Sequence, residues 1–200
     1  MLLEEHKLNI FDQHCKPLQE LSGRYHGLAE GTDGDIFTLR GLEVLRFIKL
    51  EGMYVLKEKI KLEVIEAFEK WHVLSRPKNL LYCMHTSSLH ITDHGLHKLL
   101  TVNMRNSHHK VAGYLGEGIG QFKRPTGMVV DSMGNLLVLD QGNNRIVVYT
   151  SSGKWVKVLI EAEEFEMDNP CGIHFYGDNV VVVFKGKGGR GGMVRYKLEN

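Results

Sequence analysis

Residues 120–159 read GQFKRPTGMVVDSMGNLLVLDQGNNRIVVYTSSGKWVKVL and contain four short apolar runs. The runs are Met128–Val130, Leu136–Leu139, Ile146–Tyr149 and Trp155–Leu159. Between them lie Gly, Asn, Asp and Ser residues, which are typical of tight turns between antiparallel strands. This stretch therefore predicts a four-stranded antiparallel meander, in which each strand pairs with the next one along the chain.

The same plan recurs along the chain, with strand openings near residues 25, 77, 125 and 170. Asp93 and Gly95 repeat the spacing of Asp140 and Gly142. The period is therefore about 45 to 52 residues, and four strands at such a period are typical of the blades of a β-propeller. We expect an all-β fold in which about four blades are present.

The repeat divides the whole chain, residues 1–200, into five segments. In order, these are the last strands of a blade (1–21), a degenerate blade (22–72), a blade (73–119), the most regular blade (120–160) and a final incomplete blade (161–200). The first segment aligns with the last two strands of the regular blade, and the last segment ends soon after a third strand. We therefore expect the two ends of the chain to be complementary halves of one blade.

Residues 55–71 fit two structures. Their sequence, VLKEKIKLEVIEAFEKW, fits an amphipathic helix, whereas the strict alternation of Lys59–Val64 favours a strand. The strands predicted on either side favour the second interpretation, so we expect strands here too.

The composition excludes several classes of protein. The 200 residues are 42% hydrophobic and carry a net charge of +1, so neither a disordered chain nor binding of nucleic acid by bulk charge is expected. The three cysteines, Cys15, Cys83 and Cys171, lack metal-ligand spacing and suit a reducing compartment, which predicts a cytoplasmic protein. The N-terminus does not resemble a signal peptide, and no apolar run is long enough to span a membrane.

The segment 118–159 resembles the NHL repeat. The matching positions are Gly118–Phe122, Pro125, Gly127, Val130–Asp131, Gly134–Leu136, Val138–Asp140, Gly142–Asn143, Arg145–Ile146 and Gly153–Lys154. The resemblance implies an NHL-type β-propeller, usually of six blades, and we expect this chain to be a fragment of such a ring. It also implies the C-terminal part of a TRIM-type (RING, B-box and coiled-coil) E3 ubiquitin ligase. Two positions depart from the pattern: Arg40 replaces the repeat's Asp, and Leu96 replaces its Asn.

Several repeated residues are expected to support the fold rather than to bind. They are Pro125, Gly127, Asp131, Gly134, Asp140, Gly142, Asp93 and Gly95. Asp93 and Asp140 end strands, where a short carboxylate accepts backbone N–H groups, and Lys98 and Arg145 can bridge back to them. A positive φ is expected at Gly95 and Gly142.

Blade topology places the loops between blades and the turns between second and third strands on one face. This face collects most of the predicted binding residues, whereas the opposite face carries Glu30, Asp33, Asp131 and Asp178. The candidates are Arg24, Tyr25, Arg76, Lys78, His94, His97, Lys98, Lys123, Arg124, Gln141, Asn144, Arg145, Lys185, Lys187 and Arg190. The nearly neutral chain is therefore expected to have one basic face, where single-stranded RNA or a protein partner could bind.

The function expected from these features is binding without catalysis. The resemblance implies recognition of a protein substrate or adaptor in the ubiquitination pathway, and the alternative is a propeller that binds single-stranded RNA in post-transcriptional repression. A metal-dependent lyase is the least favoured alternative, because the spacing of His90, His94 and His97 does not bring the three side chains together. No catalytic residue, cofactor, metal, membrane or DNA partner is predicted.

Overall fold

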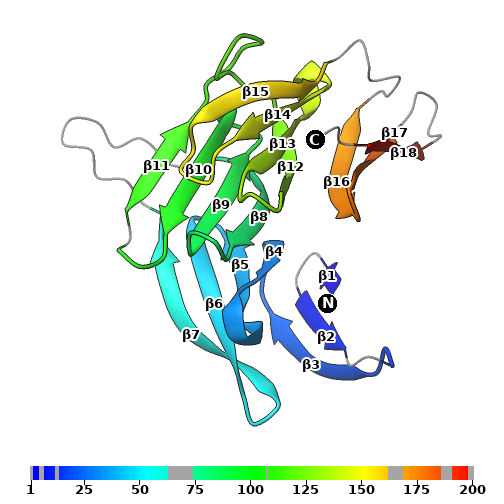
Figure 1. Cartoon of the computed structure of the whole chain (residues 1–200). Coiled ribbons are helices and arrows are strands. Elements are labelled where there is room, and N and C mark those ends of the chain that lie inside the picture. Colours follow the sequence, from blue (N-terminus) through cyan, green and yellow to red (C-terminus); the bar gives the residue numbers. More distant parts are fainter. Residues whose placement is uncertain are drawn as a thin grey trace.

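The computed structural model describes residues 2–4, 7–11, 14–62, 74–106, 108–161, 169–185 and 191–197. These residues form five antiparallel sheets that follow one another along the chain and lie around a common inner side (Figure 1). No α-helix occurs among them, and only two short 3-10 turns interrupt the strands, η1 (Thr32–Gly34) and η2 (Gln141–Asn143). The prediction of an all-β propeller is confirmed.

Three of the sheets have four strands each, paired in chain order. The second sheet contains β4 (His26–Glu30), β5 (Ile36–Arg40), β6 (Glu43–Leu50) and β7 (Met53–Lys61). The third contains β8 (Pro77–Cys83), β9 (Ser88–Asp93), β10 (Lys98–Asn103) and β11 (His109–Ala112). The fourth contains β12 (Pro125–Val130), β13 (Leu136–Asp140), β14 (Arg145–Tyr149) and β15 (Trp155–Ile160), which is the meander predicted from the sequence.

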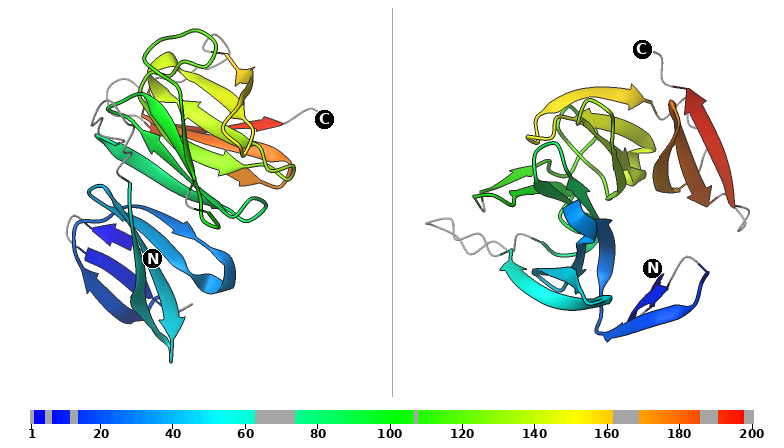
Figure 2. Two further views of the ribbon diagram at one scale, coloured as in Figure 1. Left: turned by 90° about the vertical axis from the view of Figure 1, so that its left-hand side faces the viewer. Right: turned by 60° about the horizontal axis from the view of Figure 1, so that its bottom comes forward.

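The first and last sheets have three strands each. The first contains β1 (Leu2–Glu4), β2 (Lys7–Phe11) and β3 (Pro17–Ser22), and the fifth contains β16 (Pro170–Tyr176), β17 (Asn179–Lys185) and β18 (Gly191–Lys197). They lie at the two ends of the arc of sheets, as the right-hand view of Figure 2 shows. In the described residues each end builds a three-stranded sheet of its own, and the division of the chain into blade segments stays a prediction.

Residues 55–61 lie in β7, so the strand interpretation is confirmed for this part of the ambiguous segment. Residues 63–71 lie outside the described residues. The whole of β7 pairs with β6, with one register shift opposite Arg46 and Phe47.

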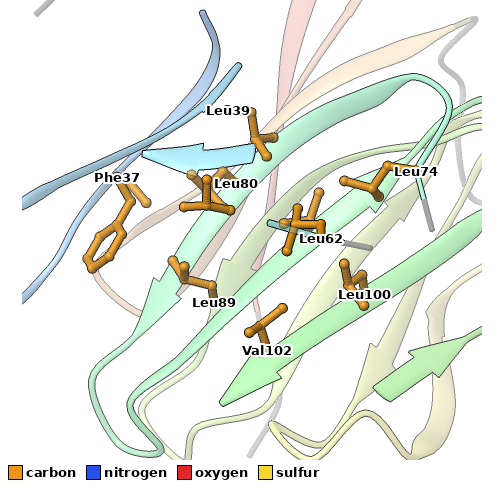
Figure 3. Packing of buried hydrophobic residues seen from close by; sticks show 11 residues of the cluster. Phe37, Leu39, Leu62, Leu74, Leu80, Leu89, Leu100 and Val102 are labelled. Atoms are coloured by element: carbon orange, nitrogen blue, oxygen red, sulfur yellow. The ribbon is translucent and has the colours of Figure 1, made fainter. Parts of the chain in front are cut away.

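Each sheet packs on the next through its own apolar cluster. Leu8 and Ile36 contribute to the cluster between the first and second sheets, and Val148 and Val180 to the cluster between the fourth and fifth. Figure 3 shows the cluster between the second and third sheets, where side chains of β5 meet those of β8, β9 and β10. Each junction between neighbouring sheets thus has its own buried apolar cluster, as expected of a repeat protein.

Candidate functional site

The first strand of each of the last four sheets is irregular at the same place. β4, β8, β12 and β16 line the inner side of the arc (Figure 1), and each shifts its register within three residues of its start. A β-bulge of this kind bends the strand and turns a side chain out of the ladder. The bulged positions include Lys78, Thr126 and Cys171.

These bulges border a pocket of about 300 Å³. Its lining comes from the third, fourth and fifth sheets and from the turns that follow β9 and β13. The lining residues are Lys78, Asn79, His94, Thr126, Gly127, Gln141, Asn169, Cys171 and Lys185. The structure thus brings together four of the predicted binding residues, which are Lys78, His94, Gln141 and Lys185.

The pocket is basic. Lys78 and Lys185 are exposed, and within the described part of the chain neither has a carboxylate partner. No Asp or Glu of the described residues lines the pocket. Burial lowers the pKa of His94 below its usual value of 6.5, and four nearby basic groups lower it further. These groups are Lys78, Arg124, His97 and Arg76. Predicted basic residues of the third and fourth sheets therefore lie close enough to the pocket residue His94 to lower its pKa.

Other predicted binding residues lie outside the pocket. The Lys123 Nζ pairs with Glu117 at 3.2 Å, and Asn144 ends the turn η2 in the left-handed region with a φ of 48°. The His97 Nδ1 accepts the backbone N–H of Arg124 at 2.9 Å. Arg24 is exposed between β3 and β4. Lys187 and Arg190 lie outside the described residues.

Arg145 is not a binding residue of the surface, and this prediction is wrong. Only 8% of the residue is exposed, because its guanidinium lies under the loop that enters the fourth sheet. The Nε donates to the Asp140 carboxylate at 2.9 Å, and the terminal nitrogens donate to the carbonyls of Glu117, Gly118 and Gln121. Arg145 therefore ties the loop 113–124 to the β13–β14 turn.

Tyr25 is not available for binding either. It is buried, its hydroxyl donates to the Ser22 carbonyl at 3.0 Å, and its ring meets Phe47 edge to face. Phe122, expected to be a packed wedge, is fully buried and stacks on Tyr149 with 5.2 Å between ring centroids. Both aromatic rings belong to the core.

Asp140 makes the contacts that a scaffold role predicts. One carboxylate oxygen accepts the Lys123 backbone N–H at 2.7 Å, and the other accepts the Asn143 side-chain amide at 2.7 Å. Burial raises the pKa of Asp140, and its hydrogen bonds and the Arg145 charge oppose this rise. Asp140 is thus the centre of a buried network that holds a turn and a loop together.

Asp93 is satisfied in another way. Its carboxylate accepts four backbone N–H groups, from Ser75, Arg76, Gly95 and Leu96. Lys98 stands opposite it in the β9–β10 ladder, but no ion pair joins these two residues, so the predicted bridge is wrong here. In the part of the chain that the structure describes, this buried carboxylate is hydrogen-bonded by backbone groups alone.

The reason for glycine at 95 and 142 differs from the expectation. Neither residue has a positive φ; the left-handed conformation falls two residues later, on His97 and Asn144. A Cβ on Gly142 would come within 2.6 Å of the Lys123 carbonyl oxygen, which accepts the Gly142 N–H at 2.6 Å. Glycine is required at position 142 because the Lys123 backbone approaches too closely for a side chain, and not because φ is positive.

The remaining repeat residues also support the fold. Asp131 accepts the N–H groups of Met133 and Asn135, and Gly134 in the same turn has a φ of 84°. A Cβ on Gly127 would lie 2.9 Å from Ile173, so this glycine lets β12 approach β16. Pro125 is buried at the start of β12.

Sequence reasoning missed four residues of the pocket, namely Asn79, Thr126, Asn169 and Cys171. All four lie in or beside the openings of the strands, where the Pro-x-Gly pattern was interpreted only as a turn and strand signal. A glycine within the first three residues recurs in β4, β12 and β16 and is a signal for a bulge, so it could have pointed to Thr126 and Cys171. β8 has no such glycine, and Asn79 carries no equivalent signal.

The histidines show no metal arrangement. Among the described residues, no group of three or more His, Cys, Asp or Glu side chains is placed to hold a metal ion. His90 is fully buried, and its Nδ1 lies 3.0 Å from the Thr101 hydroxyl. Burial lowers the pKa of His90 to about 4. In the part of the chain that the structure describes, no helix has the length and apolarity needed to cross a membrane.

Known proteins share the repeat and the fold. Residues 122–149 match the NHL repeat, and no curated protein sequence matches the chain. A catalytically inactive virginiamycin B lyase from Staphylococcus aureus, solved with quinupristin, has 14% identity and a TM-score of 0.57 over 98% of this chain and 64% of its own. A nidogen/laminin complex has 17% identity and a TM-score of 0.61 over 86% and 61%. A protein of unknown function from Bacteroides thetaiotaomicron has 17% identity and a TM-score of 0.65 over 98% and 55%.

Identities this low establish a common fold only. The chain spans 55–64% of the length of these three structures. The sheet topology, the apolar clusters between sheets and the matched repeat agree with one another. The chain is therefore a β-propeller-like protein that carries an NHL repeat at residues 122–149.

Proposed function

We propose that this chain is a non-catalytic binding module that recognises a protein partner through the face bearing the pocket. The observation that carries the proposal is the basic pocket itself, in which Lys78 and Lys185 come from different sheets and none of the described carboxylates belongs to the lining. Such a site attracts an anionic partner and fixes its position.

Exposed apolar side chains on the same face support a protein partner. The loop between β11 and β12 carries Tyr114, Leu115 and Ile119, and more than half of each residue is exposed. Aromatic and aliphatic anchors beside charged groups are typical of protein–protein interfaces. Burial of Tyr25 removes the tyrosine ring of the predicted binding set from any base stacking.

The NHL repeat supports a more specific role. By its resemblance to TRIM-type proteins, the module would select the protein substrate of an E3 ubiquitin ligase whose RING domain belongs to the same polypeptide. The nidogen/laminin complex is a case in which a structure of similar fold binds another protein. Transfer of ubiquitin to the bound partner by the whole polypeptide is the measurement that tests this role.

Site-specific photocrosslinking tests the binding proposal. A photoreactive amino acid replaces Ile119 on the proposed face or, as a control, Met133, which is equally exposed but lies in the turn between β12 and β13. In cell extract, we expect a discrete protein adduct at position 119 that is absent at position 133 and weakened by Lys78→Gln with Lys185→Gln. Recovery of RNA instead would favour the RNA-binding alternative, and equal adducts at both positions would contradict the proposal.

A further inference from the structure

Resting on the proposed function, we infer that the pocket is the binding site for a phosphorylated side chain of the protein partner. Bulged strands of three sheets build the pocket, so its walls are set by the packing of the propeller rather than by one mobile loop. Its volume of about 300 Å³ is at the lower end for ligand pockets, which suits a single charged group and its stem.

The charge of the pocket suits a dianion. Lys78 and Lys185 supply two cations that no carboxylate of the described residues neutralises. Asp93, the acid that precedes His94, is fully buried, accepts four backbone N–H groups and is not part of the pocket lining. A phosphate monoester carries close to two negative charges at neutral pH, whereas one carboxylate carries a single charge.

Another pocket, in a different part of the described chain, shows the contrast. It has a volume of about 200 Å³ and lies between β7 and β10, where Glu58 and Lys59 both line it. Opposite charges balance there, so this pocket offers no field for an anion. Accumulation of unpaired cations is therefore a property of the pocket at the openings of β8, β12 and β16.

Neutral groups in the lining complete the recognition of phosphate oxygens. Asn79, Gln141 and Asn169 carry amide groups, and the Gln141 Nε2 already donates to the Pro170 carbonyl at 2.8 Å, which holds this side chain in place. The Thr126 hydroxyl is buried without a hydrogen-bond partner among the described residues. Amide N–H and hydroxyl groups are donors that a phosphate can satisfy.

Cys171 reports on the pocket without any knowledge of the partner. It lines the pocket and is exposed, Cys15 is exposed in the turn between β2 and β3, and Cys83 is buried. Alkylation by anionic iodoacetate is compared with alkylation by neutral iodoacetamide at each thiol of the purified chain. The ratio of the two rates at one thiol cancels the ionisation and nucleophilicity of that thiol, and it leaves the local charge.

We expect the iodoacetate-to-iodoacetamide ratio at Cys171 to exceed that at Cys15 by roughly 3- to 10-fold, because the positive field concentrates the anionic reagent. Lys78→Gln with Lys185→Gln should reduce the Cys171 ratio to the Cys15 value. Lys57→Gln with Lys157→Gln, which removes two exposed charges from outer strands β7 and β15, should leave it unchanged.

The second part of the experiment tests whether phosphate protects Cys171. Inorganic phosphate and a phosphoserine peptide should each slow iodoacetate at Cys171 and not at Cys15, and the unphosphorylated peptide should slow neither. Equal ratios at the two cysteines, or no protection by the phosphopeptide, would overturn the inference. Protection by inorganic phosphate alone would also overturn it, because the site would then serve a free anion. The photocrosslinked partner would survive any of these failures, so the two proposals are tested separately.

Discussion

The hairpins β9–β10 and β13–β14 occupy equivalent places in the third and fourth sheets, and both turn around a fully buried aspartate. Asp93 is balanced by backbone N–H groups alone, whereas Asp140 also holds the guanidinium of Arg145. In the third sheet, Lys98 stands at the position equivalent to Arg145. Its ammonium group forms no ion pair with Asp93. One change of cation therefore decides whether the turn also fixes the preceding loop, because only the arginine presents several N–H donors in a rigid plane.

Removing each aspartate in turn should give the largest difference in stability between the two hairpins. We expect Asp140→Ala to lower the free energy of unfolding by about 3–5 kcal/mol, because Arg145 is left buried without its counter-charge. Asp93→Ala should cost only about 1–3 kcal/mol, since it leaves unpaired N–H groups but no buried cation. Urea denaturation of both variants measures the difference, and equal losses would show that the arginine adds nothing.

The strands that precede the two turns, β9 and β13, should differ in how much acid destabilises them. His90 in β9 takes the place that Leu137 has in β13, and burial lowers the His90 pKa to about 4. Because the folded state binds the proton less tightly than the unfolded state, whose pKa is about 6.5, stability is complete above that pH and falls as the pH drops towards 4. The loss amounts to roughly 3 kcal/mol.

His90→Leu should remove this part of the acid sensitivity. Denaturation of the variant and the unchanged chain at a series of pH values from 7 to 4 makes the comparison. The two stability curves should converge or cross as the pH falls. If they stay parallel, His90 does not require its neutral form for folding.

Exchange of the cations is the next test. Arg145→Lys should cost about 1–3 kcal/mol, because one ammonium group cannot serve Asp140 together with the three loop carbonyls and leaves some of them unpaired. The reverse exchange, Lys98→Arg, should change stability by no more than about 0.5 kcal/mol. Hydrogen exchange of the loop 113–124 should rise in Arg145→Lys alone, and protection that stays unchanged there would contradict the role of Arg145.

Alanine at the two glycines should have the smallest effect. A Cβ at position 142 meets the Lys123 backbone carbonyl at 2.6 Å, whereas a Cβ at position 95 meets side-chain atoms of Ser75 and Arg76 at 3.0–3.2 Å. Backbone cannot move as readily as an exposed side chain, so Gly142→Ala should cost about 1–3 kcal/mol and Gly95→Ala less than about 1 kcal/mol. Thermal denaturation of the pair measures this, and a greater loss in Gly95→Ala would contradict the close-approach explanation.

Much of the fold could be predicted because its signals are local. The runs in residues 120–159 became β12 to β15, and the repeat of Asp93 on Asp140 located the equivalent hairpin one sheet earlier. Turn residues and apolar alternation act within a few positions, so they survive without knowledge of the neighbours. The same local reasoning predicted a positive φ at Gly142, which is wrong. Glycine is needed there because the chain contacts Lys123, nineteen residues earlier.

The candidate site was predictable in part. Blade topology brought Lys78, His94 and Lys185 to one face, and the structure places them around one pocket. The same reasoning assigned Arg145 and Tyr25 to that face, although both are buried. Residue type and loop position do not reveal whether a side chain turns outward or beneath a loop, since that depends on what packs above it.

The amino-acid sequence alone determined the succession of strands and turns, the period of the sheets and the buried aspartates that end their second strands. Tertiary structure alone decided which cations remain free, because the loop before the fourth sheet covers Arg145 while the bulged inner strands leave Lys78 and Lys185 uncovered. The physical reason is the distance along the chain over which each kind of interaction acts. Strand and turn preferences act between near neighbours in the chain, whereas burial and charge balance depend on residues that meet only when the sheets pack around a common centre.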